Sequence, residues 1–311
     1  MEHREERLTA PVVDPPPVEE PARGSHERRL SAALFRRPRV RLAALLTLPT
    51  AWLVLVYLAA LASLLATAFF SVDEFTNEVV RTFTWQNLVD VLSEPAYLQA
   101  TARTVGIAAA VTVGCVLLGF PMAFYMAKVA PARWRNLLLA LVVTPLWASY
   151  LVKIYAWQAM VQPETGVLAW MLQPFGLPGP GYGITATVLT LTYLWLPYMI
   201  LPVYAGLERM PDSLIDASGD LGAHPARTVR SVVVPVVYPS IVAGSVFTFS
   251  LSLGDYITAQ IVGGRTQMLG TIVYQNYTSS LPFAAAVALL PVAVMVVYLM
   301  LVRRTGALDN L

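Results

Sequence analysis

Catalysis or nucleotide binding would need residue types that this sequence does not carry at the required spacing. A phosphate-binding P-loop needs a lysine directly after glycine, whereas Lys128 follows alanine and Lys153 follows valine. His3, His26 and His224 lie outside every long apolar run, so no buried serine gains an imidazole base. We therefore expect no catalytic residue, and no metal or cofactor site, in this chain.

One carboxylate stands at the end of a long apolar run that also carries hydroxyl groups. Side chains three or four residues apart share a helix face, and four polar residues follow this spacing: Ser245, Thr248, Ser252 and Asp255. The hydroxyls fit two interpretations equally, a solute path or contacts that hold helices together. For Asp255 we favour a path, because a carboxylate within a bilayer usually faces a partner or a watery cavity. Tyr256 could add a cation–π contact to an ammonium group.

Aromatic residues gather near the end of another apolar run: Trp147, Tyr150, Tyr155 and Trp157. An aromatic belt at the membrane–water interface is the common explanation of such a cluster. A wall that accepts a cation is the second explanation. Lys153 lies within this cluster and weighs against a purely cationic path, unless it points to lipid headgroups or pairs with an acid.

The elements that must position these residues are membrane-spanning helices. The composition is 57% hydrophobic and 13% charged, with a mean hydropathy of +0.60, whereas soluble domains carry about 25% charged residues. Spanning a bilayer takes about 20 helical residues. Six runs are long enough: Leu42–Phe70, Thr104–Ala127, Asn136–Trp157, Ile184–Leu207, Val232–Gly254 and Phe283–Val302. The sequence thus predicts an all-α integral membrane protein with six transmembrane helices. Prolines recur inside these runs and should bend some of the helices.

Lysine and arginine placement predicts the orientation of the chain. If the N-terminus is cytoplasmic, 17 of the 21 lysines and arginines fall in cytoplasmic segments. The positive-inside rule then places both termini in the cytoplasm. The membrane is expected to be the plasma or inner membrane of the cell. The segment between the fourth and fifth spans, residues 211–231, faces the cytoplasm in this orientation.

The segments outside the core divide the chain further. Residues 1–35 are rich in Pro, Glu and Arg and are expected to form a disordered cytoplasmic tail. Residues 36–72 hold the first span with its basic flank, "RRPRVR", which is either a stop signal or a lipid-binding patch. Residues 73–100 form an extracytoplasmic loop, 101–303 the core with five spans, and 304–311 a cytoplasmic tail. The acids of the loop either attract a cationic substrate or are simply solvated. Residues 162–183 contain a short apolar run that should form a helix in the outer interface.

The cytoplasmic segment "MPDSLIDASGDLGAHPARTVR" has the pattern of two short helices joined by a turn. Pro211 and Asp212 suit a helix start. Small residues, Ala217, Ser218 and Gly219, keep the middle of that helix thin enough for another protein to approach its backbone. Gly222 is placed to end the helix in a left-handed conformation. Pro225 then begins the second helix. An ordinary amphipathic connector is the alternative interpretation.

This segment resembles the cytoplasmic loop of permease subunits in binding-protein-dependent ABC importers. Their signature is Glu-Ala-Ala, three residues, Gly, nine residues, then Ile-x-Leu-Pro. Seven residues occupy these positions without a gap: Asp216, Ala217, Ser218, Gly222, Val232, Val234 and Pro235. Asp for Glu and Ser for Ala depart from the signature, and the shorter Asp puts a salt bridge to the partner in doubt.

The resemblance implies a fold and a set of partners. The loop would be the coupling helix, seated in a groove of a separate ATPase subunit. Its ATPase-coupling residues would be Asp216, Ala217, Ser218, Asp220, Leu221, Gly222, Ala223 and Pro235. The complex would contain a second, related permease, two ATP-binding subunits that hold ATP and magnesium, an extracytoplasmic substrate-binding protein and surrounding lipid. No nucleic acid is implied.

Further stretches resemble spermidine/putrescine-type permeases: "LGDYITAQIVGG", "PLWASYLVKIYAW" and "SLPFAAAVAL". The resemblance covers residues 45 to 303 and implies import of a polyamine. The candidate substrate-path residues are Asp255, Tyr256, Ser252, Thr248, Trp147, Tyr150, Tyr155 and Trp157. Another small organic solute is the alternative cargo. An ion-coupled secondary carrier would need titratable groups near the midplane, whereas Asp255 lies toward one end of its span.

Overall fold

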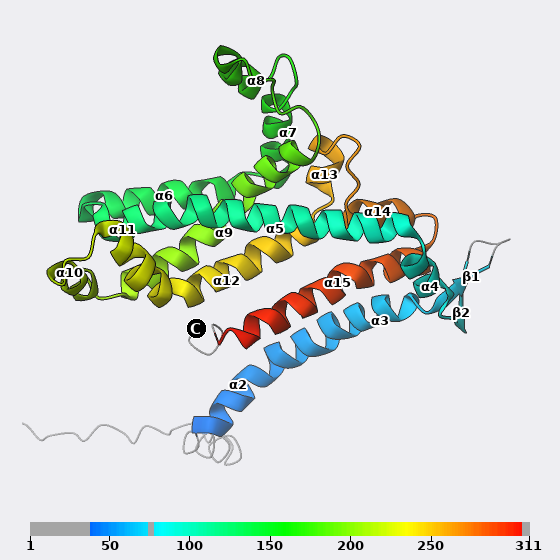
Figure 1. The fold of residues 1–311 in the computed structure, drawn as a ribbon. Helices are drawn as coiled ribbons and strands as arrows, with labels where there is room; N and C mark the ends of the chain where they lie inside the picture. The colour runs from blue at the N-terminus through cyan, green and yellow to red at the C-terminus, as the bar shows by residue number, and fades with distance from the viewer. Residues whose placement is uncertain (1–37, 74–77, 307–311) are drawn as a thin grey trace, which may run out of the picture. The chain divides into compact units, whose positions relative to one another are not determined.

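The computed structural model describes residues 38–73 and 78–306. The expected disordered tail at 1–35 and most of the expected C-terminal tail lie outside these residues. The chain divides into two compact units, Met1–Leu61 and Ala62–Leu311, which are treated separately. The described residues are mainly helical (Figure 1).

The first unit consists of helical turns with exposed apolar side chains. It contains α2 (Pro38–Trp52), the π-helix η1 (Leu53–Leu58) and the beginning of α3 (Ala59–Thr67). None of the residues in the most apolar window of the span Leu45–Thr67 is buried. Leucine, valine and tryptophan exposed over this length are expected to face lipid, because a span surrounded by hydrocarbon needs no protein cover.

The centre of the second unit is a group of three long helices that pack against one another (Figure 1). They are α5 (Pro95–Phe124), α9 (Ile184–Arg209) and α12 (Val234–Leu253). Their shared core contains fully buried apolar side chains such as Val111, Leu191 and Val203. The helix α5 continues through the π-helix η2 (Tyr125–Val129), in which the Ala130 amide bonds the Tyr125 carbonyl five residues back at 2.8 Å.

Glycines allow these helices to approach closely. A Cβ atom on Gly244 of α12 would lie 2.7 Å from Sδ of Met199 and 3.2 Å from its Cα, on α9. A Cβ on Gly114 of α5 would lie 3.1 Å from Oγ1 of Thr192. Small residues at such crossings are the usual means of packing helices within a membrane, because backbone contact replaces the missing hydrophobic driving force.

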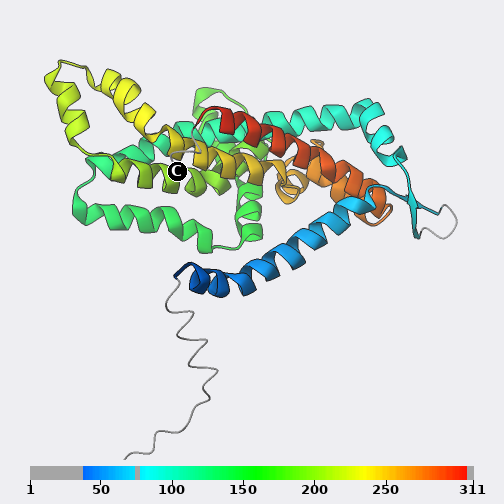
Figure 2. The same ribbon diagram turned by 90° about the horizontal axis from the view of Figure 1, so that it is seen from below.

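The third span is broken, which corrects the prediction of one helix over Asn136–Trp157. The helix α6 (Ala132–Trp147) meets α7 (Tyr150–Met160) at an angle of 95°, and Figure 2 shows the turn between them. Ala148 and Ser149 have extended backbones with ψ of 142° and 137°. Pro145 weakens the preceding turn because it has no amide hydrogen to donate.

Short elements occupy the segments expected to be loops. The predicted connection 73–100 holds part of a hairpin, with β1 paired antiparallel to β2. It also holds a short helix, α4, and the first turns of α5, which begins at Pro95. A short helix does form within 162–183, as predicted. These elements are β1 (Phe70–Val72), β2 (Val79–Phe83), α4 (Gln86–Ser93), α8 (Val167–Leu172), η3 (Gln173–Phe175), α13 (Ile257–Val262) and α14 (Leu269–Tyr277).

The last span is α15 (Leu281–Arg304), which packs against α14 and α4. Its first turn is capped by Ser280, whose hydroxyl accepts the Phe283 amide at 3.4 Å. Within the described residues, five helices are long and apolar enough to cross a membrane, and α6 with α7 makes a sixth crossing if the bent pair is one span. The expected number of spans is thus confirmed on length and composition.

A larger residue at the crossing of α9 and α12 should destabilise the bundle. We expect Gly244→Val to lower the free energy of unfolding by about 1–3 kcal/mol, since overpacking must displace Met199. Gly106→Val is the matched control, because the space around Gly106 on α5 is open. Thermal denaturation of the detergent-solubilised protein measures both, and equal midpoints for the two variants would contradict close packing at Gly244.

Candidate functional site

The segment after α9 forms a helical hairpin, visible at one end of the bundle in yellow-green (Figure 2). It contains α10 (Ser213–Asp220), α11 (Pro225–Thr228) and the π-helix η4 (Val229–Val233), which leads into α12. Gly222 has φ of 76°, which confirms the predicted left-handed turn. The Ala223 amide bonds the Ser218 carbonyl at 3.1 Å and the Gly222 amide bonds the Gly219 carbonyl at 2.8 Å. This is a Schellman motif, which pairs the last carbonyls of α10.

Most of the predicted coupling residues are exposed on this hairpin. Leu221 is 88% exposed and Ala223 is half-buried. Four others are exposed on the hairpin, Asp216, Ala217, Asp220 and Gly222, while Pro235 is exposed at the start of α12. Ser218 differs, because its side chain is buried and its hydroxyl bonds that of Thr228 on α11 at 2.9 Å. Ser218 therefore holds the two short helices together, and the thin exposed surface consists of Ala217 and Gly219.

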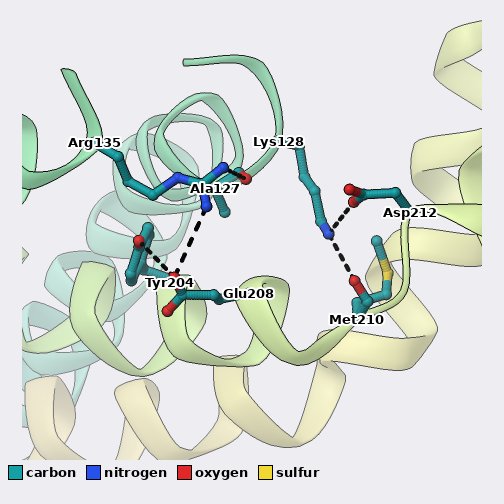
Figure 3. A network of polar contacts seen from close by, with 7 residues as sticks. All are labelled: Ala127, Lys128, Arg135, Tyr204, Glu208, Met210 and Asp212. Carbon is teal, nitrogen blue, oxygen red and sulfur yellow. Dashed lines mark hydrogen bonds and ion pairs between the residues drawn. The ribbon is translucent and has the colours of Figure 1, made fainter. Parts of the chain in front are cut away.

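A lysine of η2 fixes the point where the hairpin leaves α9 (Figure 3). The Lys128 ammonium donates to the Met210 carbonyl at 2.7 Å and pairs with the Asp212 carboxylate at 2.5 Å. This hydrogen bond and the lysine charge hold the pKa of Asp212 below its ordinary value of 3.8. A depressed folded-state pKa means that the pair contributes stability above the unfolded pKa and loses it as pH falls through the folded value. The pair is therefore intact at neutral pH.

An arginine at the start of α6 makes a second connection in the same network (Figure 3). Arg135 donates to the Ala127 carbonyl at 2.9 Å and lies 3.9 Å from the Glu208 carboxylate. The Tyr204 hydroxyl donates to the same carboxylate at 3.2 Å. Lys128 and Arg135 thus join η2, α6, the end of α9 and the beginning of α10. No pattern in the sequence predicted these contacts, since the reach of Lys128 and Arg135 across helices is not encoded in local spacing.

The candidate substrate-path carboxylate lies beyond the end of the fifth span. Because α12 ends at Leu253, Asp255 does not continue the helix face of the hydroxyl residues, and that part of the prediction is corrected. Asp255 is 7% exposed. Its carboxylate accepts the Thr258 amide at 2.8 Å, at the first turn of α13, and the Tyr150 hydroxyl of α7. The Tyr150 and Thr258 hydroxyls are 3.1 Å apart. Asp255 thus joins the broken third span to α13.

The hydroxyl residues of α12 lie between helices. Thr248 and Ser252 are fully buried, and Ser252 donates to the Thr248 carbonyl at 2.7 Å. Thr248 contacts the Thr112 hydroxyl of α5 at 3.4 Å, while Ser245 bonds the Tyr298 hydroxyl of α15 at 2.7 Å. The contacts of Thr248 and Ser245 favour the second of the two interpretations, in which the hydroxyls hold helices together, whereas the Ser252 bond stays within α12.

The four aromatic residues near the third span do not form one wall. Trp147 is 87% exposed and Tyr155 is also exposed. Tyr150 stacks on Trp195 with ring centroids 5.9 Å apart, and Trp157 packs on Tyr193 at 5.4 Å. Two of the residues are therefore held within the bundle and two face outward, where an interfacial aromatic belt would be.

Tyr256, a predicted path residue, belongs to an aromatic group whose other members, Tyr274 and Tyr277, were not predicted. Tyr256 stacks on Tyr274 of α14 at 4.9 Å, and both line a cavity of about 310 Å³ together with Tyr277. The backbones come close at this point, since a Cβ on Gly270 would lie 3.0 Å from the Asp255 carbonyl. The apolar run in α14 is too short to stand out in the sequence, so its tyrosines gave no usable signal.

Comparison with known proteins shows what the chain is similar to. Residues 116–306, more than half of the chain, match the family described as "Binding-protein-dependent transport system inner membrane component". The inner membrane ABC transporter permease protein YdcU of Escherichia coli K12 is 40% identical over 300 residues, 91% of this chain and 95% of that protein. The spermidine/putrescine permease protein PotB of Haemophilus influenzae is 31% identical over 226 residues, 70% of this chain and 78% of that protein.

Solved structures show the same fold. The chain is similar to one in a bacterial alginate ABC transporter bound to a periplasmic protein, with a TM-score of 0.65 at 16% identity, covering 86% of this chain and 95% of that one. A second structure of a bacterial alginate importer gives a TM-score of 0.61 at 17% identity, covering 89% and 98%. At these identities the similarity concerns the fold alone.

The bond between Ser218 and Thr228 gives a prediction about the hairpin. Thr228→Val leaves the buried Ser218 hydroxyl without this partner, so we expect the opening free energy of the hairpin to fall by about 1–3 kcal/mol. The double variant Ser218→Ala/Thr228→Val removes both hydroxyls and should be close to the wild type. Amide hydrogen exchange of residues 213–228 measures the difference. Equal losses in the single and double variants would contradict the cost of an unpaired buried hydroxyl, and no loss in Thr228→Val would show that the hydroxyl pair is unimportant.

Proposed function

Since the chain belongs to the family of binding-protein-dependent transport system inner membrane components, we propose that it lines the path by which an ATP-driven importer takes up a polyamine. Membership establishes a multi-pass membrane protein that serves as a permease subunit of an ABC importer. The coupling site, the cargo and the partners are the further parts of the proposal.

The exposed hairpin is the observation that carries the coupling role. An apolar Leu221 and two carboxylates, Asp216 and Asp220, project from a turn that is internally capped. We propose that α10 sits in a groove of a cytoplasmic ATP-binding subunit, so that closure of two such subunits around ATP and magnesium displaces it. A second, related permease and an extracytoplasmic binding protein complete the importer, and both termini of this chain are cytoplasmic.

The cargo proposal rests on the charge and aromatic groups beside α13. A polyamine carries ammonium groups along an alkyl chain, so it needs a carboxylate and can use aromatic faces. Asp255 supplies the carboxylate, and Tyr256, Tyr274 and Tyr277 line the neighbouring cavity. The name of the Haemophilus influenzae relative, at 31% identity, supports this cargo class. We infer that an arriving ammonium competes with the Tyr150 hydroxyl for the Asp255 carboxylate.

Two other functions differ from this proposal in ways that can be measured. The 40% identical relative has a name that specifies no cargo, and another small organic solute is the second candidate. An ion-coupled carrier would act without partner subunits. Uptake by this chain alone in liposomes would support the carrier, while co-purification of an ATP-binding subunit supports the importer.

The coupling role predicts the effect of a charge in the turn of the hairpin. Asp tolerates the left-handed conformation, so Gly222→Asp should insert and fold while its carboxylate disturbs the docked surface. We expect loss of uptake and of transport-linked ATP hydrolysis in proteoliposomes containing the assembled importer. Gly222→Asn adds a neutral side chain of similar size and should retain more activity. Full transport by Gly222→Asp is incompatible with docking at this turn.

The cargo role predicts a separate effect at Asp255. Asn at this position can still accept the Thr258 amide, but it lacks the charge for an ammonium group, so the KM for spermidine should rise about tenfold or more. ATP hydrolysis should remain under control of the binding protein. Tyr150→Phe is the control, because it removes one hydrogen bond and leaves the carboxylate charged. Unchanged uptake kinetics in Asp255→Asn would remove Asp255 from the path.

A further inference from the structure

Lys128 is held in a defined position between two helices. Its side chain is 8% exposed, although it lies at an end of the bundle. The ammonium contacts the carbonyl of Met210, which ends α9, and the carboxylate of Asp212, which precedes α10. A cation at the C-terminal carbonyls of a helix is favourable because it complements the helix dipole.

Arg135 reinforces this connection from α6. It donates to the carbonyl of Ala127, next to Lys128 in η2, and approaches Glu208 in the last turn of α9. The turn between η2 and α6 is thereby closed on itself and linked to α9. Lys128 and Arg135 together connect α5, α6 and α9 where the hairpin begins (Figure 3).

Most of α10 packs within its own hairpin, and Ile215 of α10 also packs against the hydrophobic core of the bundle. Its main neighbours in the structure are α11 and η4, both beyond Gly222 in sequence. Displacement of α10 can therefore reach the bundle through η4 into α12, through Ile215 into the core, or through the Met210–Asp212 turn into the helices bound by Lys128.

We propose that Lys128 is a positioning residue that passes the displacement of α10 to α5 and α6 through the Met210–Asp212 turn. This inference rests on the proposed function, in which an ATP-binding subunit contacts α10. Without the lysine, the Met210–Asp212 turn is no longer attached to η2. Displacement of α10 then reaches α5 and α6 only by the less direct routes through α9 and α12.

A lipid-anchoring lysine is the competing explanation, and the geometry argues against it. A side chain that reaches headgroups extends into solvent, whereas that of Lys128 is enclosed and has two acceptors. Arg133, five residues on in the first turn of α6, is exposed and can extend into solvent as such an anchor does. It provides a control that removes the same charge close by in the chain.

The test measures transmission directly in the assembled importer. A fluorophore on Leu137→Cys, an exposed position of α6, reports movement of α6 on addition of ATP and vanadate. A photo-crosslinker on Leu221→Cys reports contact of the hairpin with the ATP-binding subunit. Both are measured in the wild-type background and in Lys128→Met, Asp212→Ala, the double variant and Arg133→Met.

In Lys128→Met we expect crosslinking to persist while the ATP concentration for half-maximal α6 movement rises roughly three- to tenfold. Asp212→Ala should shift in the same direction. This residue is 79% exposed and makes no side-chain capping bond to α10, so the variant should fold even if Lys128→Met does not assemble. In the double variant this ATP concentration should rise no further than in the more impaired single variant, because both substitutions remove the same contact. Arg133→Met should respond as the wild type.

The outcomes separate this inference from the proposed function. Absence of crosslinking in the wild-type background overturns docking at α10, and the inference with it. Normal crosslinking with an unchanged α6 response in Asp212→Ala overturns the role of the Lys128 contact alone. Additive shifts in the double variant, or an equal shift in Arg133→Met, would also overturn it, since either result indicates a general effect of charge.

Discussion

Hydrocarbon offers no hydrogen-bond partner to a peptide group, and this constraint shapes both the long helices of the protein and the places where they stop. The third span breaks after Trp147 and the fifth ends at Leu253. These interruptions lie together, because Tyr150 from the first and Asp255 from the second share one cluster with Thr258. The Asp255 carboxylate accepts the Thr258 amide at the start of α13. The same carboxylate accepts the Tyr150 hydroxyl, so it links α13 to the break in the third span.

At the opposite end of the bundle, charged side chains also bind backbone groups at helix ends, but there the side chains are cations and the backbone groups are carbonyls. Helices leave their last carbonyls unpaired, and here cations fill the gap: Lys128 at Met210 and Arg135 at Ala127. Each cation also meets a carboxylate, Asp212 or Glu208. Helix termini are thus joined to one another at both ends of the bundle.

The features that could be predicted from the sequence are those that depend on local residue patterns. Long apolar runs located the spans, and Gly222 marked the left-handed turn because few other residues favour positive φ. The break at Ala148–Ser149 was not predictable in this way, since neither residue is a strong helix breaker. The segments before and after the break are also similarly apolar, so composition does not mark the break. The contacts of Lys128 and Arg135 depend on helices that lie side by side only in the fold. Tyr274 and Tyr277 join the candidate site for the same reason.

The two departures from the family signature have different physical meanings. Ser218, in place of alanine, is buried against Thr228, so its hydroxyl is accommodated within the hairpin and does not reach a docked partner. Asp216, in place of glutamate, is exposed, so a salt bridge to its shorter side chain would have to come from a partner subunit. A basic residue of an ATP-binding subunit would have to approach the backbone of α10 more closely, and the small residues Ala217 and Gly219 leave room for that approach. Adaptation of the partner is therefore expected opposite Asp216, because Ser218 is already satisfied by its own chain.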